Sequence, residues 1–152
     1  MTEVFIDDGR CFACGPYSAD GMHLRFEPDG ERGVRAEITL PQRFQGWQGI
    51  AHGGIVMTLL DEAMAHACGA IGERAVTAST EVRFRGAVLL GRPLVVRGEV
   101  LWKRRQVIGV KASVAFADGT LLASAEGSFV SRGPLGKERY GIPDAAPIVG
   151  GP

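Results

Sequence analysis

A nearly continuous apolar segment in the middle of the chain, residues 55–70, limits the folds that this sequence can adopt. Its length predicts a helix, but its apolar side chains surround the whole circumference instead of forming one stripe. They are Ile55, Val56, Met57, Leu59, Leu60, Ala63, Met64, Ala65, Ala67 and Cys68. Such a helix must be enclosed, so the rest of the chain has to supply the enclosing surface.

Alternating apolar and polar residues on both sides of this helix predict β-strands. The predicted strands cover residues 22–27, 33–40, 75–85, 93–103, 106–116 and 121–131. In the third strand the alternation places Val76, Ala78, Thr80, Val82 and Phe84 on one face, and in the fourth it places Trp102 on the apolar face. Strands around one helix favour an α+β domain, in which a curved antiparallel sheet wraps around the helix.

Length and composition are those of an ordinary globular protein. The 152 residues predict one domain, residues 21–132, with an irregular N-terminal lead-in of residues 1–20 and a flexible C-terminal tail of residues 133–152. The formal net charge is zero, so charge favours neither a nucleic-acid nor a membrane partner. The acidic N-terminus differs from a secretory signal. Three cysteines, an odd number, argue against a disulfide framework and favour the cytoplasm.

Residues at the start of the predicted helix carry the chemistry. His52, Gly53 and Gly54 stand where the helix begins, and the glycines leave backbone N–H groups uncovered at its positive end. Asp61 and Glu62 follow within about three turns, and a carboxylate on an otherwise apolar helix is costly to bury without a purpose. A donor and a base on one element predict an acyl-transfer site.

Four motifs match one known pattern, namely Cys11-Phe-Ala-Cys14-Gly15, His52-Gly53-Gly54, Leu59-Leu60-Asp61-Glu62-Ala63 and Val82-Arg83-Phe84. With them, residues 11–131 resemble the hotdog-fold acyl-CoA thioesterases, in the branch of the phenylacetate-pathway and thioesterase-superfamily-member enzymes. The resemblance implies a hotdog fold, a curved antiparallel sheet wrapped around one central helix. It also implies a homodimer, or a tetramer of two dimers, with sheets joined edge to edge and active sites at the dimer interface.

The resemblance implies roles for individual residues. Asp61, nine residues after His52, would act on the partner subunit's substrate as general base or nucleophile. The N–H of Gly53, with Gly54 as the alternative, would donate to the thioester oxygen, and Thr77 would hold the water or orient Asp61. His52 would act as an acid or position the loop, and we favour positioning because no nucleophile needs it as a base.

Further residues are predicted to bind substrate. Coenzyme A carries phosphates that Arg and Lys suit, although the basic residues could equally be solvated strand ends. Glu62, about 100° around the helix from Asp61, is the second candidate for the essential carboxylate. Phe44, Trp47 and Met57 either line an acyl pocket or belong to the core. The predicted substrate-binding residues are Gly54, Glu62, Ser79, Arg83, Arg85, Lys103 and Arg104.

Cys11 and Cys14 form a C-x-x-C pair, and His23 follows nine residues after the second cysteine. A structural zinc ion needs four ligands, and only Cys68 is left as a further thiol. A redox pair would need a βαβ context that this sequence lacks. We therefore expect a thiol pair in a turn, with zinc and redox chemistry as the alternatives, and neither a metal nor a cofactor.

The leading functional prediction is an acyl-CoA thioesterase, which converts an acyl-CoA substrate to a carboxylic acid and free coenzyme A. One alternative is a non-catalytic acyl-CoA-binding hotdog protein. The other is an acyl-thioester hydratase or dehydratase, whose catalytic motifs the chain lacks. The acyl group, and the choice between coenzyme A and an acyl carrier protein, stay open.

Overall fold

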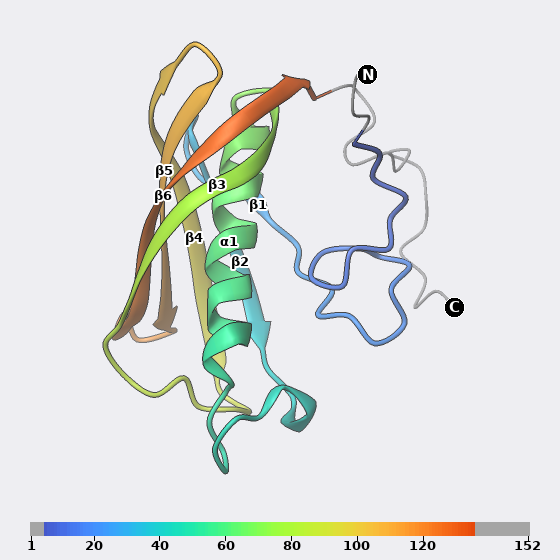
Figure 1. Ribbon diagram of the computed structural model, residues 1–152. Helices are drawn as coiled ribbons and strands as arrows, with labels where there is room; N and C mark the ends of the chain where they lie inside the picture. The colour runs from blue at the N-terminus through green and yellow to red at the C-terminus, as the bar shows by residue number, and fades with distance from the viewer. Residues whose placement is uncertain (1–4, 136–152) are drawn as a thin grey trace.

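The computed structural model describes residues 5–135, which contain one α-helix and six strands (Figure 1). Helix α1 spans Gly53–Ala70, and a short 3-10 helix, η1, spans Gln42–Phe44. The strands are β1 (Glu27–Pro28), β2 (Gly33–Thr39), β3 (Glu73–Phe84), β4 (Pro93–Arg104), β5 (Val107–Phe116) and β6 (Leu121–Pro134). In this part of the chain they form one antiparallel sheet in the order β1-β2-β4-β5-β6-β3.

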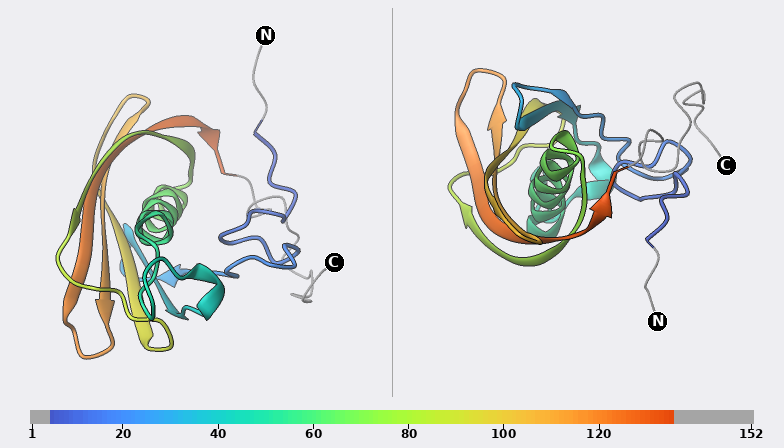
Figure 2. Two further views of the ribbon diagram at one scale, coloured as in Figure 1. Left: turned by 60° about the horizontal axis from the view of Figure 1, so that its bottom comes forward. Right: turned by 90° about the horizontal axis from the view of Figure 1, so that it is seen from above.

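The sheet curves around α1, as the view along the helix shows (Figure 2). Alternate residues of the central strands point at the helix and are buried, among them Leu94, Val96, Ile108, Val110 and Val114. The helix packs closely on β4 at Gly98, where an added Cβ would stand 2.2 Å from the carbonyl oxygen of Ala63. A residue larger than glycine would push the helix off the sheet, so this glycine sets how tightly the two layers pack. The predicted α+β arrangement of a curved sheet around one helix is confirmed.

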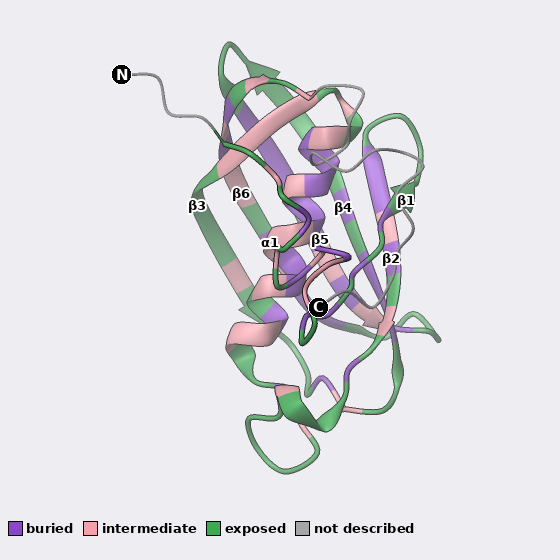
Figure 3. Cartoon of the chain, turned by 90° about the vertical axis from the view of Figure 1, so that its right-hand side faces the viewer, coloured by how far each residue is buried: buried purple, intermediate pink, exposed green. Residues whose placement is uncertain are grey.

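The N-terminal lead-in covers the side of α1 that the sheet leaves open (Figures 1 and 2). The lead-in contributes Ala13, and the segment of residues 21–26 that follows it contributes Met22, Leu24 and Phe26, to the same buried cluster as the helix. Most of α1 is therefore buried or partly buried, and the exposed residues are Gly53 and Met57 near its start and Ala70 at its end (Figure 3). This second cover explains why the helix is apolar all round.

The strand predicted over residues 22–27 is wrong except at its end. Buried and exposed residues alternate from Met22 to Phe26, but the backbone N–H groups of Met22 and Leu24 bond to Phe12 and Ala13 of the lead-in. Pairing with the sheet begins only at Glu27, opposite Arg35 of β2. The alternation predicted correctly which side chains are buried, but it did not predict the hydrogen-bond partners of the backbone.

A β-bulge in β3 changes the predicted face of that strand. The register with β6 shifts between Thr77 and Ser79, so one residue is inserted and the alternation reverses. After the bulge Val82 packs against the core. Before the bulge it is Thr77, not Val76 or Ala78, that faces the helix, because Thr77 bonds to a residue of α1. The predicted grouping of Val76 and Ala78 with Val82 is wrong for this reason.

Other boundaries differ by smaller amounts. A second bulge, between Val100 and Trp102 of β4, takes the Trp102 ring off the buried face and leaves it against Gly109. Strand β6 continues to Pro134, so the first residues of the predicted tail belong to the sheet, and the tail from residue 136 lies outside the described residues. Among the described residues, no helix has the length and apolar character needed to cross a membrane.

Candidate active site

The start of α1 presents one backbone donor. His52 is the N-cap residue, and its Nδ1 accepts a hydrogen bond from the N–H of Gly54 at 2.9 Å. This bond fixes the loop on the helix and occupies the donor of Gly54. The N–H of Gly53 has no acceptor among residues 5–135, and Gly53 is exposed. Of the two predicted donors, Gly53 is therefore the one open to a ligand at the positive end of the helix.

Asp61 lies further along the same helix and faces β3. Its Oδ1 accepts a hydrogen bond from Oγ1 of Thr77 at 2.6 Å. Burial raises the pKa of Asp61, the hydrogen bond from Thr77 opposes that rise, and the negative charge of Glu62 adds to it. The carboxylate is thus held in one orientation, half-buried on an apolar helix, which is the environment of a candidate base.

The donor and the carboxylate of one chain are far apart. Gly53 and Asp61 are separated by eight residues of helix, which is about 12 Å along its axis. One thioester carbonyl cannot contact both groups at hydrogen-bond distance. A single chain therefore carries both parts of the predicted site but does not bring them together.

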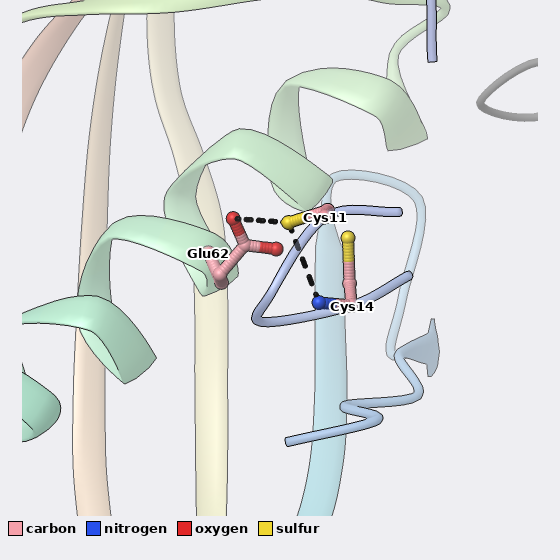
Figure 4. A group of neighbouring side chains, drawn as sticks. All are labelled: Cys11, Cys14 and Glu62. Carbon is pink, nitrogen blue, oxygen red and sulfur yellow. Dashed lines mark hydrogen bonds between the residues drawn. The ribbon is translucent and has the colours of Figure 1, made fainter. Parts of the chain in front are cut away.

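Glu62 points away from Asp61, toward the lead-in. Its Oε1 lies 3.9 Å from Sγ of Cys11 (Figure 4). Its Oε2 lies 3.5 Å from Nε2 of His66. His66 is buried, and its ring packs on Phe26 at a centroid distance of 4.5 Å. The two adjacent carboxylates therefore lie on different faces of the helix.

Ser79 is separated from Asp61 by the bulge in β3. Its Oγ is 2.7 Å from Oγ of Ser128, and both residues line a groove on the outer face of the sheet. The alternation with buried Phe129 places Ser128 on the face that points away from α1. The structure does not bring Ser79 to the helix, and Thr77 is the hydroxyl residue that reaches the carboxylate.

The predicted basic residues form two separate groups. Arg83 and Arg85 lie at the end of β3 where Phe84 approaches Gly53. Lys103 pairs with Glu73 at the opposite end of β3, and Arg104 is the last residue of β4. Ten residues of strand separate Glu73 from Arg83, roughly 33 Å if fully extended. One chain therefore cannot place all four basic side chains on one phosphate group.

Large apolar side chains surround the helix start without being buried. Trp47 is 81% exposed, Phe84 is 53% exposed and Met57 is 45% exposed, whereas Phe44 packs against the core. The choice between pocket and core is thus settled for Phe44, which is core, and for Trp47 and Met57, which are not. Exposed aromatic and Met side chains of this size are typical of surfaces that bind a partner or a ligand.

Cys11 and Cys14 lie in one tight turn against α1. The N–H of Cys14 is 3.5 Å from Sγ of Cys11, and the N–H of Gly15 bonds to the carbonyl oxygen of Cys11 at 2.8 Å. A hydrogen bond from Cys14 lowers the pKa of Cys11 to about 6, and the same bond with burial raises the pKa of Cys14. All three cysteines are free.

The third member of this cluster is Glu62, which sequence reasoning did not connect with the thiols. Ligand atoms of Cys11, Cys14 and Glu62 all lie within 4.8 Å of one another. His23 is exposed and contacts the carbonyl oxygen of Ser18, and Cys68 is buried on the helix outside this group. No local signal links Glu62 to a turn about fifty residues earlier, because only the folding of the lead-in over α1 makes them neighbours.

The described fold agrees with comparisons to known proteins. A family model described as the thioesterase superfamily matches residues 48–123, half of the chain. No curated protein matches the sequence.

Solved structures match more of the chain. A thioesterase superfamily protein shares 26% identity at a TM-score of 0.77, over 84% of this chain and 67% of that one. The PaaI protein of the phenylacetic acid degradation operon of Escherichia coli shares 20% identity at a TM-score of 0.70, over 76% and 84% of the two chains. A Streptococcus mutans protein bound to acetyl-CoA shares 21% identity at a TM-score of 0.69, over 73% and 90%. These likenesses confirm the hotdog fold.

Proposed function

Because the chain belongs to the thioesterase superfamily, we propose that it hydrolyses an acyl-CoA thioester to a carboxylic acid and free coenzyme A. The observation that carries this proposal is the 2.6 Å hydrogen bond between Thr77 and Asp61. It holds a half-buried carboxylate on an apolar helix in one orientation, as a base or nucleophile requires. The acetyl-CoA bound to the streptococcal relative supports coenzyme A as the carrier.

The proposed reaction uses the two separate groups of the site. The N–H of Gly53 donates to the thioester oxygen and stabilises the charge that develops there, an effect worth about 3 kcal/mol of barrier for one such donor. Asp61 removes a proton from a water whose oxygen then bonds to the carbonyl carbon. The carbon–sulfur bond breaks, and the coenzyme A thiolate takes up the proton that Asp61 accepted.

We propose that two chains complete the site. Gly53 and Asp61 of one chain are about 12 Å apart along α1, so the donor of one subunit has to meet the carboxylate of another. Strand β3 is an edge strand of the described sheet, and its free edge is suited to antiparallel pairing with a second copy. Such a homodimer would also cover the exposed side chains of Trp47, Met57 and Phe84. We place it in the cytoplasm, since all three of its cysteines are free.

Free thiol release from acyl-CoA substrates tests the proposed function. The panel should contain short, medium, long and aryl acyl groups on coenzyme A, and one acyl group on an acyl carrier protein. The proposal predicts multiple turnovers with at least one acyl-CoA. Stoichiometric binding of every acyl-CoA without thiol release, in a folded protein, would contradict it and favour the non-catalytic binding function.

A further inference from the structure

A compact cluster of three ligand-type side chains lies outside the proposed active site, where the lead-in crosses α1. It consists of the two thiols of Cys11 and Cys14 and the carboxylate of Glu62 (Figure 4). The thiols come from one turn of the lead-in, and the carboxylate comes from the facing side of the helix. We propose that Cys11, Cys14 and Glu62 bind a zinc ion, which fastens the lead-in to α1.

The turn that carries the thiols is built as a chelating loop. Both sulfur atoms reach the same side of it, three residues apart in sequence, and the backbone N–H of Cys14 points at Sγ of Cys11 at 3.5 Å. Gly15 permits the turn, because an added Cβ would stand 2.4 Å from the backbone nitrogen of Cys11 and 2.5 Å from the carbonyl oxygen of Gly9. This N–H contact and this glycine keep the two thiols close together before any ion binds.

The distances fit a tetrahedral zinc ion. Zinc lies about 2.3 Å from thiolate sulfur and about 2.0 Å from carboxylate oxygen, so the sulfur and oxygen ligands of one ion are roughly 3.5 Å apart. Sγ of Cys11 is 3.9 Å from Oε1 of Glu62, and all three ligand atoms lie within 4.8 Å of one another. Side-chain movements of up to about 1 Å would bring all three atoms to the distances that one zinc ion requires. Two soft thiolates with one carboxylate favour zinc over calcium or magnesium.

The surroundings of the cluster also favour a cation. The side chain of Glu62 is 16% exposed. It faces the thiol of Cys11, and a thiol binds a metal as an anion. His66 lies 3.5 Å from the second oxygen of Glu62 and can orient this ligand as an outer-shell residue, as neighbours of metal ligands commonly do. Three protein ligands leave the fourth position of the ion to a water molecule, so this site would be open, unlike closed structural zinc sites with four protein ligands.

Metal binding by the full-length chain tests this proposal. Reduced protein stripped with EDTA is titrated with zinc chloride, and zinc per chain is measured after gel filtration. We expect one zinc ion per chain and a higher thermal unfolding midpoint. Cys11→Ser, Cys14→Ser and Glu62→Gln should each weaken binding by more than the roughly 10–100-fold that loss of an outer-shell partner costs. Cys68→Ala, a thiol variant outside the cluster, should bind zinc as the wild type does.

A second measurement covers the case in which a ligand variant fails to fold. Cobalt added to the reduced wild-type protein should give the absorption bands of thiolate ligands, and zinc should abolish them. Absence of these bands with no bound zinc, or wild-type affinity in any of the three ligand variants, would overturn the assignment. Neither readout depends on thioester hydrolysis, so the zinc site and the proposed function stand or fall separately.

Discussion

Asp61 and Glu62 show how neighbouring residues of one type acquire different chemistry. A rotation of about 100° along the helix turns Asp61 toward Thr77 of β3 and Glu62 toward Cys11 of the lead-in. Sequence spacing was sufficient to predict that the two side chains point in different directions, but it could not predict which residues each of them contacts. The contacting residues, Thr77 and Cys11, are sixteen and fifty-one residues away in sequence.

The role proposed for Thr77, to position Asp61, can be tested separately from folding. Thr77→Val keeps the branched shape but removes the hydroxyl that bonds to Asp61. We expect kcat to fall by roughly tenfold or more, within the range of general-base effects, with little change in KM. Thr77→Ser should restore most of the turnover, because it returns the donor. Equal loss in the Val and Ser variants would contradict this role.

The two glycines at the helix start should differ in their tolerance of a methyl group. An added Cβ on Gly54 would lie 3.1 Å from Nδ1 of His52, whereas on Gly53 it would lie 3.8 Å from the Phe84 ring. Gly54→Ala should therefore strain the His52 cap and lower the free energy of unfolding by about 1 kcal/mol. Gly53→Ala serves as the matched control and should unfold at nearly the wild-type urea concentration. The reverse order of stabilities would show that His52 does not cap the helix.

Among the elements, β3 shows best which features of a strand the sequence predicts and which it does not. Period-two alternation predicted its existence and its length to within two residues, because alternation depends only on which side chains are apolar. Alternation could not predict the bulge, because the bulge is defined only by the register with β6. The bulge is nevertheless what places Thr77 beside Asp61, so this part of the site could not be derived from the pattern.

The start of β3 is joined to its neighbours by Glu73, which contacts Lys103 of β4 and Ser131 of β6. The hydrogen bond from Lys103, with that from Ser131, lowers the pKa of Glu73 below its usual 4.5. A lowered pKa in the folded state contributes stability above the unfolded pKa, and this contribution is lost as pH falls through the folded pKa. Glu73→Gln should therefore unfold below the wild-type temperature at pH 7.

That difference between wild type and Glu73→Gln should shrink as the pH falls below about 4.5. Thermal unfolding of both proteins across this range measures it. Lys103→Met provides a second test, because it removes one of the two donors to Glu73, and its unfolding temperature should depend on pH in the same way. A difference that stays constant with pH would contradict the role assigned to the Glu73 carboxylate.

For the molecule as a whole, the apolar helix was the most informative feature of the sequence. It required a cover on every side, which predicted the curved sheet, and the sheet is confirmed. It did not reveal that the lead-in and residues 21–26 supply the remaining cover. The alternation of Met22, Leu24 and Phe26 predicted a strand of the sheet, and Ala13 belongs to no regular pattern. The same cover brings the thiol pair to Glu62, so the candidate metal site depends on a tertiary contact that no local pattern reports.

The central claim is that Asp61 is the carboxylate that activates water in thioester hydrolysis. The most direct test is the rate of coenzyme A release by wild type, Asp61→Asn and Glu62→Gln, with circular dichroism showing that all three are folded. We predict that Asp61→Asn lowers kcat by about 100-fold or more, because the shape is kept while the base is lost, and that Glu62→Gln lowers it by much less. Near-normal turnover in Asp61→Asn, with loss in Glu62→Gln, would contradict the account.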